Sequence, residues 1–296
     1  MTINSFPSVV IITALLILSS HFTHSAELTY PDKRYPNEEP EVFAEGFISK
    51  QDQNEFRMSV SADGSQYFYS IFDKRQNNYL ILHTIYHNNR WSDPQPFKLT
   101  TLGDFEPFLT QNGNRFYFSS NRKPAKNRQD SNIWKIEKHK NKWSSPQSLP
   151  FNTSDSEWVA SETLSGNIYF ARFDAQDKAD IYVYENTDQH NKIGRNLTTI
   201  NTIDFNEFEP YVDPLERFML FSSNRDEVGK VINLYISVNK KGIWGKPVNL
   251  GNKINNGSNV YSPTISPDGK YLFFNRDGDF YWVDFLKTIK TLKIVL

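Results

Sequence analysis

The sequence predicts an all-β protein, a single β-propeller of five blades with four strands each. Three observations predict it: a strand-turn-strand segment recurs five times, the turns are about 50 residues apart, and a Trp-Pro marker follows three of the copies. Aromatic residues make up 15% of a chain whose mean hydropathy is −0.60, which suits strands with one buried and one polar face. A sixth blade stays open as an alternative.

The repeated segment is a short strand, a polar turn and a second strand rich in aromatic residues. The first copy reads FRMSVSADGSQYFYS and the fifth reads YSPTISPDGKYLFFNR; the copies begin at Phe56, Phe105, Trp158, Phe208 and Tyr261. The spacings between their turns are 49, 53, 50 and 53 residues, measured at Gly64, Gly113, Gly166, Glu216 and Gly269.

The turns predict β-hairpins. Asp63-Gly64, Asn112-Gly113 and Asp268-Gly269 are pairs that two-residue hairpin turns prefer, because both residues of such a turn take positive φ. Pro214-Leu215-Glu216 lacks the glycine, which predicts a turn of another geometry in the fourth copy.

Two further strands complete each unit. We expect third strands near residues 79–86, 132–137, 179–184, 233–238 and 279–283. The Trp-Pro marker then appears as WSDPQPFKL, WSSPQSLP and WGKPVNLG, and its counterpart in unit three, near residues 193–197, lacks both residues. Because proline removes a ladder donor, this fourth strand is predicted at the outer edge, as in a propeller blade.

The two ends of the chain are predicted to complete one blade together. Unit five stops after its third strand and continues into a helical tail near residues 285–292. Residues 41–47 have no inner strands of their own and are expected to supply the missing outer strand. Closing the ring in this way removes exposed sheet edges.

The N-terminus resembles a signal peptide. An unbroken apolar run of ten residues, 9–18, is too short to span a bilayer, and small or polar residues after it offer cleavage after Ser25 or Ala26. No Lys or Arg precedes the run, so an uncleaved anchor or a buried strand remain alternatives. We expect a signal peptide over 1–25, an extension over 26–40 and the propeller over 41–296. The mature protein would then be periplasmic or secreted, monomeric and without a membrane span.

Charge and cysteine content exclude several classes of function. The 33 basic and 34 acidic residues give a net charge of −1, which makes no electrostatic case for nucleic acid or an anionic membrane. The chain has no cysteine, which excludes disulfides, thiolate metal sites, cysteine nucleophiles and the lipid anchor of a bacterial lipoprotein.

The repeat resembles a known family. The strings SPTISPDGKYLFFNRDGDFYWVD, FEPF, FYFSSNR and WGKPVNLG are similar to the TolB-like, WD40-like propeller repeat of bacterial exported proteins. The resemblance covers roughly residues 40–285. It implies the fold and, because that family consists mostly of binding and assembly modules, it implies binding rather than a particular reaction.

The candidate binding residues lie on the predicted inner strands, which line the channel. Five of them are Arg57, Glu106, Glu157, Glu162 and Glu209, with Glu207 beside them. Carboxylates and an arginine at the channel mouth could bind a cation, a sugar or a basic peptide end. The alternative is that they bond neighbouring blades, because a position that recurs in most blades is more often architectural.

Arginines end the second strand in three units. Arg122, Arg225 and Arg276 each follow an asparagine, and Arg172 is their expected counterpart in unit three. An arginine can pair with a carboxylate and stack on an aromatic ring, which favours a latch to a glutamate of the adjacent blade. A phosphate or carboxylate ligand, with Arg122 and Arg225 as binding residues, is the alternative.

The expected function is non-enzymatic binding of a protein, peptide or glycan in the cell envelope, at the channel mouth or the loops. The alternative is a glycoside hydrolase that uses channel carboxylates. His83 and His87 form a possible metal pair without an evident third ligand, and Asp277-Gly278-Asp279 is better interpreted as a hairpin turn than a calcium loop. The sequence calls for no cofactor or metal.

Overall fold

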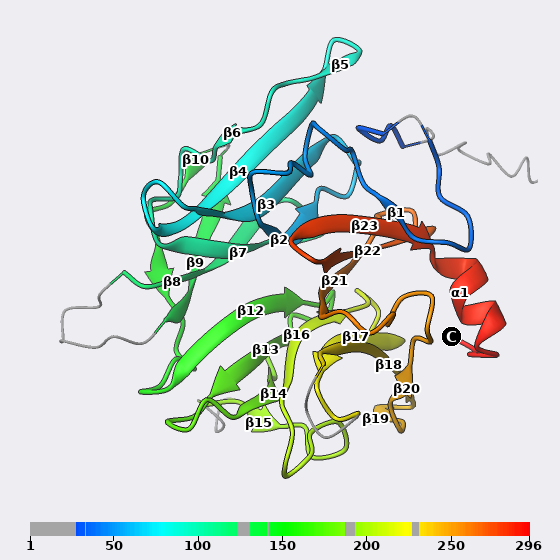
Figure 1. Ribbon diagram of the computed structural model, residues 1–296. Coiled ribbons are helices and arrows are strands. Elements are labelled where there is room, and N and C mark those ends of the chain that lie inside the picture. The colour runs from blue at the N-terminus through cyan, green and yellow to red at the C-terminus, as the bar shows by residue number, and fades with distance from the viewer. Residues whose placement is uncertain (1–27, 33, 123–130, 141, 187–192, 227–230) are drawn as a thin grey trace, which may run out of the picture.

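Five separate antiparallel sheets surround a central axis and form a β-propeller (Figure 1). The computed structural model describes residues 28–32, 34–122, 131–140, 142–186, 193–226 and 231–296. Over these residues the all-β propeller prediction is confirmed, with five blades rather than six. The predicted signal peptide, residues 1–25, lies outside them.

Each blade has three long strands and a short outer edge. Blade one contains β2 (Glu55–Val60), β3 (Gln66–Asp73), β4 (Asn78–His87), β5 (Arg90–Trp91) and β6 (Gln95–Pro96). Blade two contains β7 (Asp104–Leu109), β8 (Arg115–Ser120), β9 (Asn132–His139), β10 (Lys142–Trp143) and β11 (Gln147–Ser148). Blade three contains β12 (Ser156–Glu162), β13 (Ile168–Phe173), β14 (Ala179–Tyr184) and β15 (Arg195–Asn196).

The last two blades follow the same order. Blade four contains β16 (Glu207–Val212), β17 (Phe218–Ser223), β18 (Asn233–Lys240), β19 (Ile243–Trp244) and β20 (Val248–Asn249). Blade five contains β21 (Val260–Ile265), β22 (Tyr271–Arg276), β23 (Asp279–Asp284) and β1 (Glu41–Val42). The short strands β6, β11 and β20 pair only with β4, β9 and β18 in the described sheets, so the proline-containing segments are edges as predicted.

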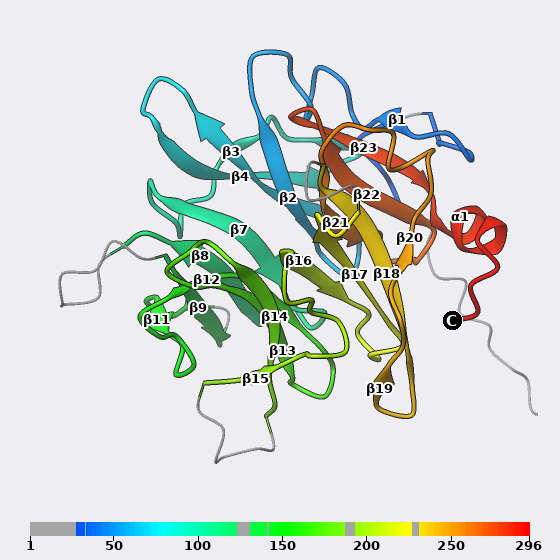
Figure 2. The same cartoon turned by 60° about the horizontal axis from the view of Figure 1, so that its bottom comes forward.

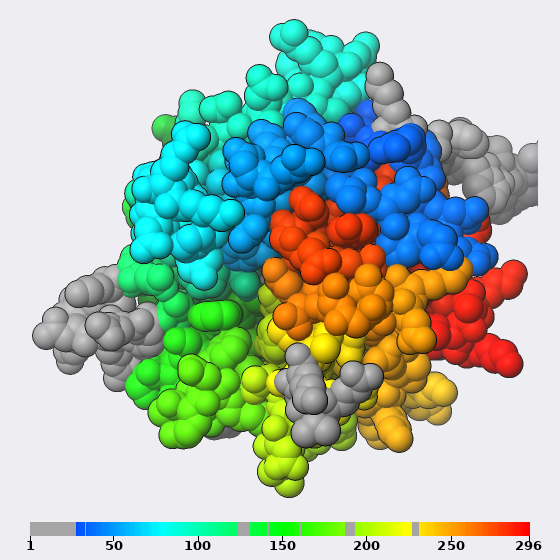
Figure 3. All heavy atoms as spheres, in the orientation of Figure 1, coloured from blue at the N-terminus to red at the C-terminus, as the bar shows by residue number. Residues whose placement is uncertain are grey.

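The propeller has two distinct faces. The turns that join first to second strands, and third to fourth strands, lie at one end of the blades, which we call the turn face. The opposite end, the loop face, carries the second-to-third connections and the linkers between blades, residues 43–54, 97–103, 149–155, 197–206 and 250–259. Figure 3 views the loop face, with the blue linker 43–54 and the orange linker 250–259 toward the viewer.

The five repeated turns share one geometry, which corrects two predictions. In each, the residue at the glycine position has φ between 57° and 84°, and its N–H donates to the carbonyl three residues earlier. Asp63 does not have positive φ, so the hairpins are not two-residue Asx-Gly turns. Its Oδ1 instead accepts the N–H of Ser65 at 3.0 Å, a local Asx bond that explains the residue type.

Glu216 adopts the glycine conformation in blade four, although a different turn was predicted there. Its φ is 57°, and its N–H donates to Asp213 O at 2.7 Å. Its carboxylate accepts bonds from four side chains of blade three, those of Thr163, Ser165, Asn167 and Tyr169, at 2.7–3.2 Å. These bonds between blades offset the roughly 1–2 kcal/mol cost of a left-handed conformation.

The N-terminal segment closes the ring, as predicted. Glu41 and Val42 pair antiparallel with Trp282 and Tyr281, and Phe43 N–H donates to Phe280 O at 2.8 Å. The regular pairing ends there, so the closing strand is shorter than the predicted 41–47. Blade five is therefore completed by a strand that comes before blade one in the sequence, and this strand connects the first and last blades.

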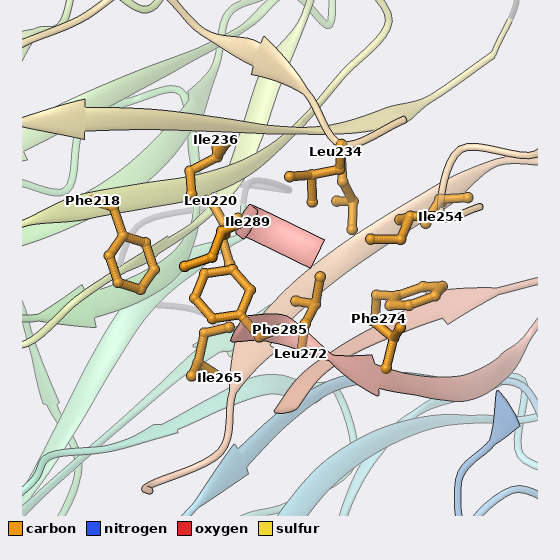
Figure 4. Close-up of a cluster of buried hydrophobic side chains, with 13 residues drawn as sticks. Phe218, Leu220, Leu234, Ile236, Ile254, Ile265, Leu272, Phe274, Phe285 and Ile289 are labelled. Atoms are coloured by element: carbon orange, nitrogen blue, oxygen red, sulfur yellow. The ribbon is translucent and has the colours of Figure 1, made fainter. Parts of the chain in front are cut away.

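The core lies between the blades. Five clusters of buried apolar side chains occupy the five blade interfaces. Figure 4 shows the cluster between blades four and five, where Phe285 and Ile289 of α1 (Phe285–Thr291) pack on Phe218 and Leu272. The predicted helical tail is thus confirmed, and it lies at the rim beside β20 and β23 (Figure 2). No helix among the described ranges is long and apolar enough to cross a membrane.

Candidate functional site

A bulge interrupts the first strand of every blade at the equivalent position. The register shifts there, and the bulge residue has a φ between 43° and 56°; these residues are Arg57, Glu106, Val159, Glu209 and Ser262. Non-glycine residues rarely adopt such a φ, and a β-branched valine is strained in it. All five are at most 6% exposed, so the bulges direct these side chains into the interior near the axis.

Arg57 bonds across the channel to two other blades. Its Nη1 donates to Pro263 O at 3.5 Å and its Nη2 to Pro210 O at 3.4 Å. Its Nε has no hydrogen-bond partner among the described residues. Burial lowers the pKa of Arg57, and the charges of Glu106 and Glu209 raise it. The guanidinium is therefore held near two carboxyl groups inside the propeller.

The two carboxyl groups differ in their hydrogen bonds. Glu209 accepts from Ser222 Oγ at 2.8 Å, and from the backbone N–H and Oγ of Ser262 at 2.7 and 2.8 Å. Glu106 Oε2 has no partner in the described part of the chain. Burial raises the pKa of both groups, and the charge of Glu209 raises that of Glu106 further, against the effect of Arg57. The pKa of Glu106 is therefore raised more strongly than that of Glu209.

We call Arg57, Glu106 and Glu209 the channel charge cluster. The sequence predicted them at the channel mouth, whereas the structure buries them in the interior of the propeller because the bulge turns each side chain inward. A cluster so deeply buried can hold the blades in register, and it can bind a ligand only if that ligand enters the channel.

A second set of carboxylates lies where the first strands begin, and each pairs with an arginine of the same blade. The pairs are Asp104–Arg122, Glu157–Arg172 at 2.8 Å and Glu207–Arg225 at 3.0 Å. The predicted latch between adjacent blades is therefore wrong for these arginines. The start of a first strand lies beside the end of its own second strand, so the same blade provides the nearer partner.

The four arginines also stack on aromatic pairs. Each guanidinium lies 4.5–5.4 Å from the centroids of two rings that face each other on the second and third strands. Arg172 and Arg276 lie two positions earlier along the second strand than Arg122 and Arg225 do. All four guanidinium groups nevertheless reach the equivalent rings. Cation–π contacts of this kind favour an architectural role for all four.

Glu162 forms the bond between blades that the sequence attributed to other residues. Its carboxylate accepts two bonds from Arg115 and one from Tyr117 Oη, at 2.8 Å, both residues of β8 in blade two. The carboxyl group is buried and fully used in this contact. The Glu162 carboxylate is therefore not free to bind a ligand.

Blades one and five break the pairing pattern in opposite ways. Glu55 begins the first strand of blade one, but Ile71 occupies the position where Arg172 stands in blade three. Glu55 Oε1 accepts Lys50 N–H at 3.2 Å, Oε2 has no described partner, and burial raises the pKa of Glu55 to about 8. In blade five Arg276 faces Val260, and it donates to the carbonyls of residues 253 and 254 instead.

Replacing Glu55 with glutamine is expected to stabilise the protein by about 2–4 kcal/mol at pH 8 and very little at pH 5. The folded-state pKa of about 8 lies above the unfolded value of 4.5. The wild-type protein therefore has its full stability below pH 4.5, where Glu55 is protonated in both states. It loses stability as the pH rises from 4.5 through about 8, because unfolding then releases the proton. Urea unfolding at both pH values measures the difference, with Glu45→Gln on an exposed residue as control. Parallel pH profiles for wild type and Glu55→Gln would contradict the assignment.

A chain of aromatic side chains crosses the loop face at the strand ends of blades one to four. Six of them, which we call the entrance ring, form a chain of contacts with centroids 4.4–6.3 Å apart: Phe56, Tyr79, Phe105, Trp158, Phe173 and Phe208. All except Phe105 are half-buried, with part of the ring surface accessible. The ring therefore presents flat apolar surfaces next to the buried charge cluster.

Sequence reasoning missed the entrance ring, although its signal was present. An aromatic residue precedes the bulge in all five copies, and blade five has Tyr261 there. Burial raises the pKa of Tyr261 to about 12, with the charges of Glu209 and Glu106 acting in the same direction. The side chain lies one residue before the bulge, and in every blade except blade two, where Phe105 is buried, it is only half-buried.

The possible metal sites gain no support from the described residues. His83 stacks on Phe68 with centroids 4.1 Å apart, and burial lowers its pKa to about 4. No group of three or more His, Cys, Asp or Glu residues gathers as metal ligands in the described ranges. Asp277-Gly278 forms the short β22–β23 connection, consistent with the predicted hairpin turn.

Comparison with known proteins supports the fold. No protein-family model and no curated protein matches the chain. Similar solved structures include the protein assigned as TolB in Agrobacterium tumefaciens, at 14% identity and a TM-score of 0.51, with 75% of this chain and 69% of that chain covered. An endo-arabinase from Bacteroides thetaiotaomicron has 13% identity and a TM-score of 0.53, with coverage of 84% and 96%.

A thermostable family-43 glycoside hydrolase is a third similar structure, at 16% identity and a TM-score of 0.51, with coverage of 80% and 91%. At these identities the likeness establishes architecture alone. The chain has a TolB-like β-propeller fold, as its repeat predicted. Because the same fold occurs in proteins with different names and reactions, the function must be argued from the site.

Proposed function

We propose that the protein is an exported, non-catalytic binding module of the cell envelope, whose ligand docks on the entrance ring. The observation that carries the proposal is the chain of aromatic rings across the loop face, in which every ring except that of Phe105 is half-buried. Exposed aromatic faces are typical anchors of binding sites, because they bury large apolar areas at little conformational cost. A glycan chain or an extended peptide offers the flat or apolar groups that such rings contact.

Export rests on the apolar run at residues 9–18 and the small residues that follow it. We also propose that the protein is a monomer. The complete lack of cysteine fits a protein whose stability in either redox environment comes from packing between blades.

The second candidate is glycoside hydrolysis, because two of the similar structures are an endo-arabinase and a glycoside hydrolase. It requires a carboxylic acid and a carboxylate that reach one glycosidic bond. Glu106 and Glu209 are the available pair, at 3% and 6% exposure. Release of reducing ends from a polysaccharide panel by wild type, abolished in Glu106→Gln and Glu209→Gln, would replace binding with hydrolysis.

Replacing Trp158 with alanine is expected to weaken ligand binding at least tenfold, because truncating a central aromatic anchor costs more than about 1.4 kcal/mol. Phe208→Ala on the neighbouring blade should act in the same direction. Glycan and peptide arrays identify the ligand, and calorimetric titration of the purified variants measures the affinity.

Tyr35→Ala is the matched control, since Tyr35 is 52% exposed and packs on Tyr271 and Trp282 of blade five, outside the entrance ring. Urea unfolding of each variant verifies that the propeller remains folded. Full affinity in both Trp158→Ala and Phe208→Ala would refute docking on the entrance ring.

A further inference from the structure

The turn face carries exposed aliphatic side chains that the binding function does not use. Leu164 and Leu215 occupy the first turns of blades three and four and are 64% and 65% exposed. Ile243 follows the β18–β19 turn at 69%, and Leu286 of α1 is 54% exposed. We call these four residues the turn-face patch. Monomeric proteins seldom leave so many large aliphatic groups exposed on one face without an interaction.

The patch is continuous along this side of the molecule. Leu164, Leu215 and Leu286 line one surface hollow of 460 Å³, and Leu164 N–H donates to Pro214 O at 2.9 Å, which joins the two turns. Ile243 lines a second hollow of 440 Å³. The segment 294–296 connects them, since Ile294 borders the second hollow and Leu296 the first.

Positive charge accompanies the patch. Lys240, Lys241 and Lys246 are exposed beside Ile243, and none has a carboxylate within 4 Å among the described residues. The acids that line the first hollow are already paired, Asp213 with Arg217 and Asp268 with Lys270. The balanced net charge of the chain therefore conceals a local excess of free lysines.

We propose that the turn-face patch docks the protein peripherally on an anionic membrane surface. Aliphatic groups at turn tips enter the lipid interface, while lysines beside them contact lipid phosphates. A second copy of this chain is a poorer partner, because two such lysine clusters would repel each other. With the turn face on the membrane, the entrance ring on the loop face points away from it and remains accessible to ligand.

Sedimentation of the full chain with vesicles tests the proposal. Wild type is expected to bind phosphatidylglycerol–phosphatidylcholine vesicles, to bind pure phosphatidylcholine weakly, and to be released by 1 M salt, where the Debye length is only ~3 Å. Lys240→Gln, Lys241→Gln and Lys246→Gln combined should lower the partition coefficient roughly 100-fold, about fivefold per charge. Leu164→Ser with Leu215→Ser should also reduce binding.

Two control variants make the same changes on the loop face. Lys74→Gln, Arg75→Gln and Lys98→Gln remove three exposed charges, and Leu102→Ser with Ile203→Ser removes aliphatic groups that are 46% and 93% exposed. Both should bind vesicles like wild type. Equal losses of vesicle binding in the turn-face and loop-face variants would overturn the proposal. It would also be overturned if the turn-face variants bound vesicles as strongly as wild type, because binding would then be assigned to the apolar N-terminal run.

Light scattering gives the remaining outcome. Dimerisation in solution that the turn-face substitutions abolish would identify the patch as a contact between copies and overturn membrane docking. Trp158→Ala should bind vesicles like wild type, so the result is independent of the ligand proposed for the entrance ring.

Discussion

Replacing Arg57 with methionine is expected to lower the free energy of unfolding by about 3–5 kcal/mol at pH 8, the cost of leaving a buried carboxylate without its counter-charge. Arg57 is 1% exposed and acts on Glu106 and Glu209 in the channel. The loss should be smaller at pH 5. Burial raises the folded-state pKa of both carboxyl groups, so their protonated forms become available as the pH falls.

A double variant separates the charge from the packing. Arg57→Met combined with Glu209→Gln removes both charges, and it should recover most of the stability that the single change loses. Urea unfolding followed by tryptophan fluorescence, at pH 8 and pH 5, measures all three proteins. Equal instability of the single and double variants would mean that Arg57 acts through its bonds to Pro210 and Pro263 rather than through its charge.

Replacing Phe43 with alanine is expected to cost about 3–5 kcal/mol and to open the ring at its closure. Phe43 is fully buried and contacts Tyr67 of blade one and Phe273 and Trp282 of blade five, with centroids 4.8–5.7 Å apart. Its N–H also continues the pairing of β1 with β23. Truncation removes a ring that contacts both blades.

Phe151→Ala provides the comparison, because Phe151 is equally buried and stacks on Phe170 between blades two and three, away from the closure. Both variants should lose similar global stability. Only Phe43→Ala should accelerate hydrogen–deuterium exchange in a peptide covering residues 279–284. Equal exchange in the two variants would show that the closing strand is held by its backbone pairing alone.

The repeat made the architecture predictable. Turn spacing gave the number of blades, and proline in WSDPQ and WGKP indicated the outer edges. The missing fourth strand of unit five predicted a partner within residues 41–47, of which 41–42 form the strand. These inferences depend on periodicity and backbone donors, which a sequence displays directly. Glu216 shows the limit, because its turn was predicted to differ and is instead maintained by bonds from another blade.

The candidate site was harder to predict because it depends on where the side chains point, and not only on which strand carries them. Glu106 and Glu209 were correctly assigned to inner strands, but the bulge with positive φ that turns them inward has no marker in a single chain. Arg122 was correctly expected to pair with a carboxylate, but its partner was misassigned because the pairing of strand ends decides which acid is nearest. Their role in ligand binding stays a prediction.

The segment that leads into the closing strand also affects how the propeller folds. Tyr30 Oη donates to Asp268 across 238 residues of sequence, so the segment made first finds its partners only when nearly the whole chain is present. Contacts so distant in sequence slow folding and leave blade-one edges uncovered in the meantime. The segment around Tyr30 would therefore stay unpaired until the fifth blade forms.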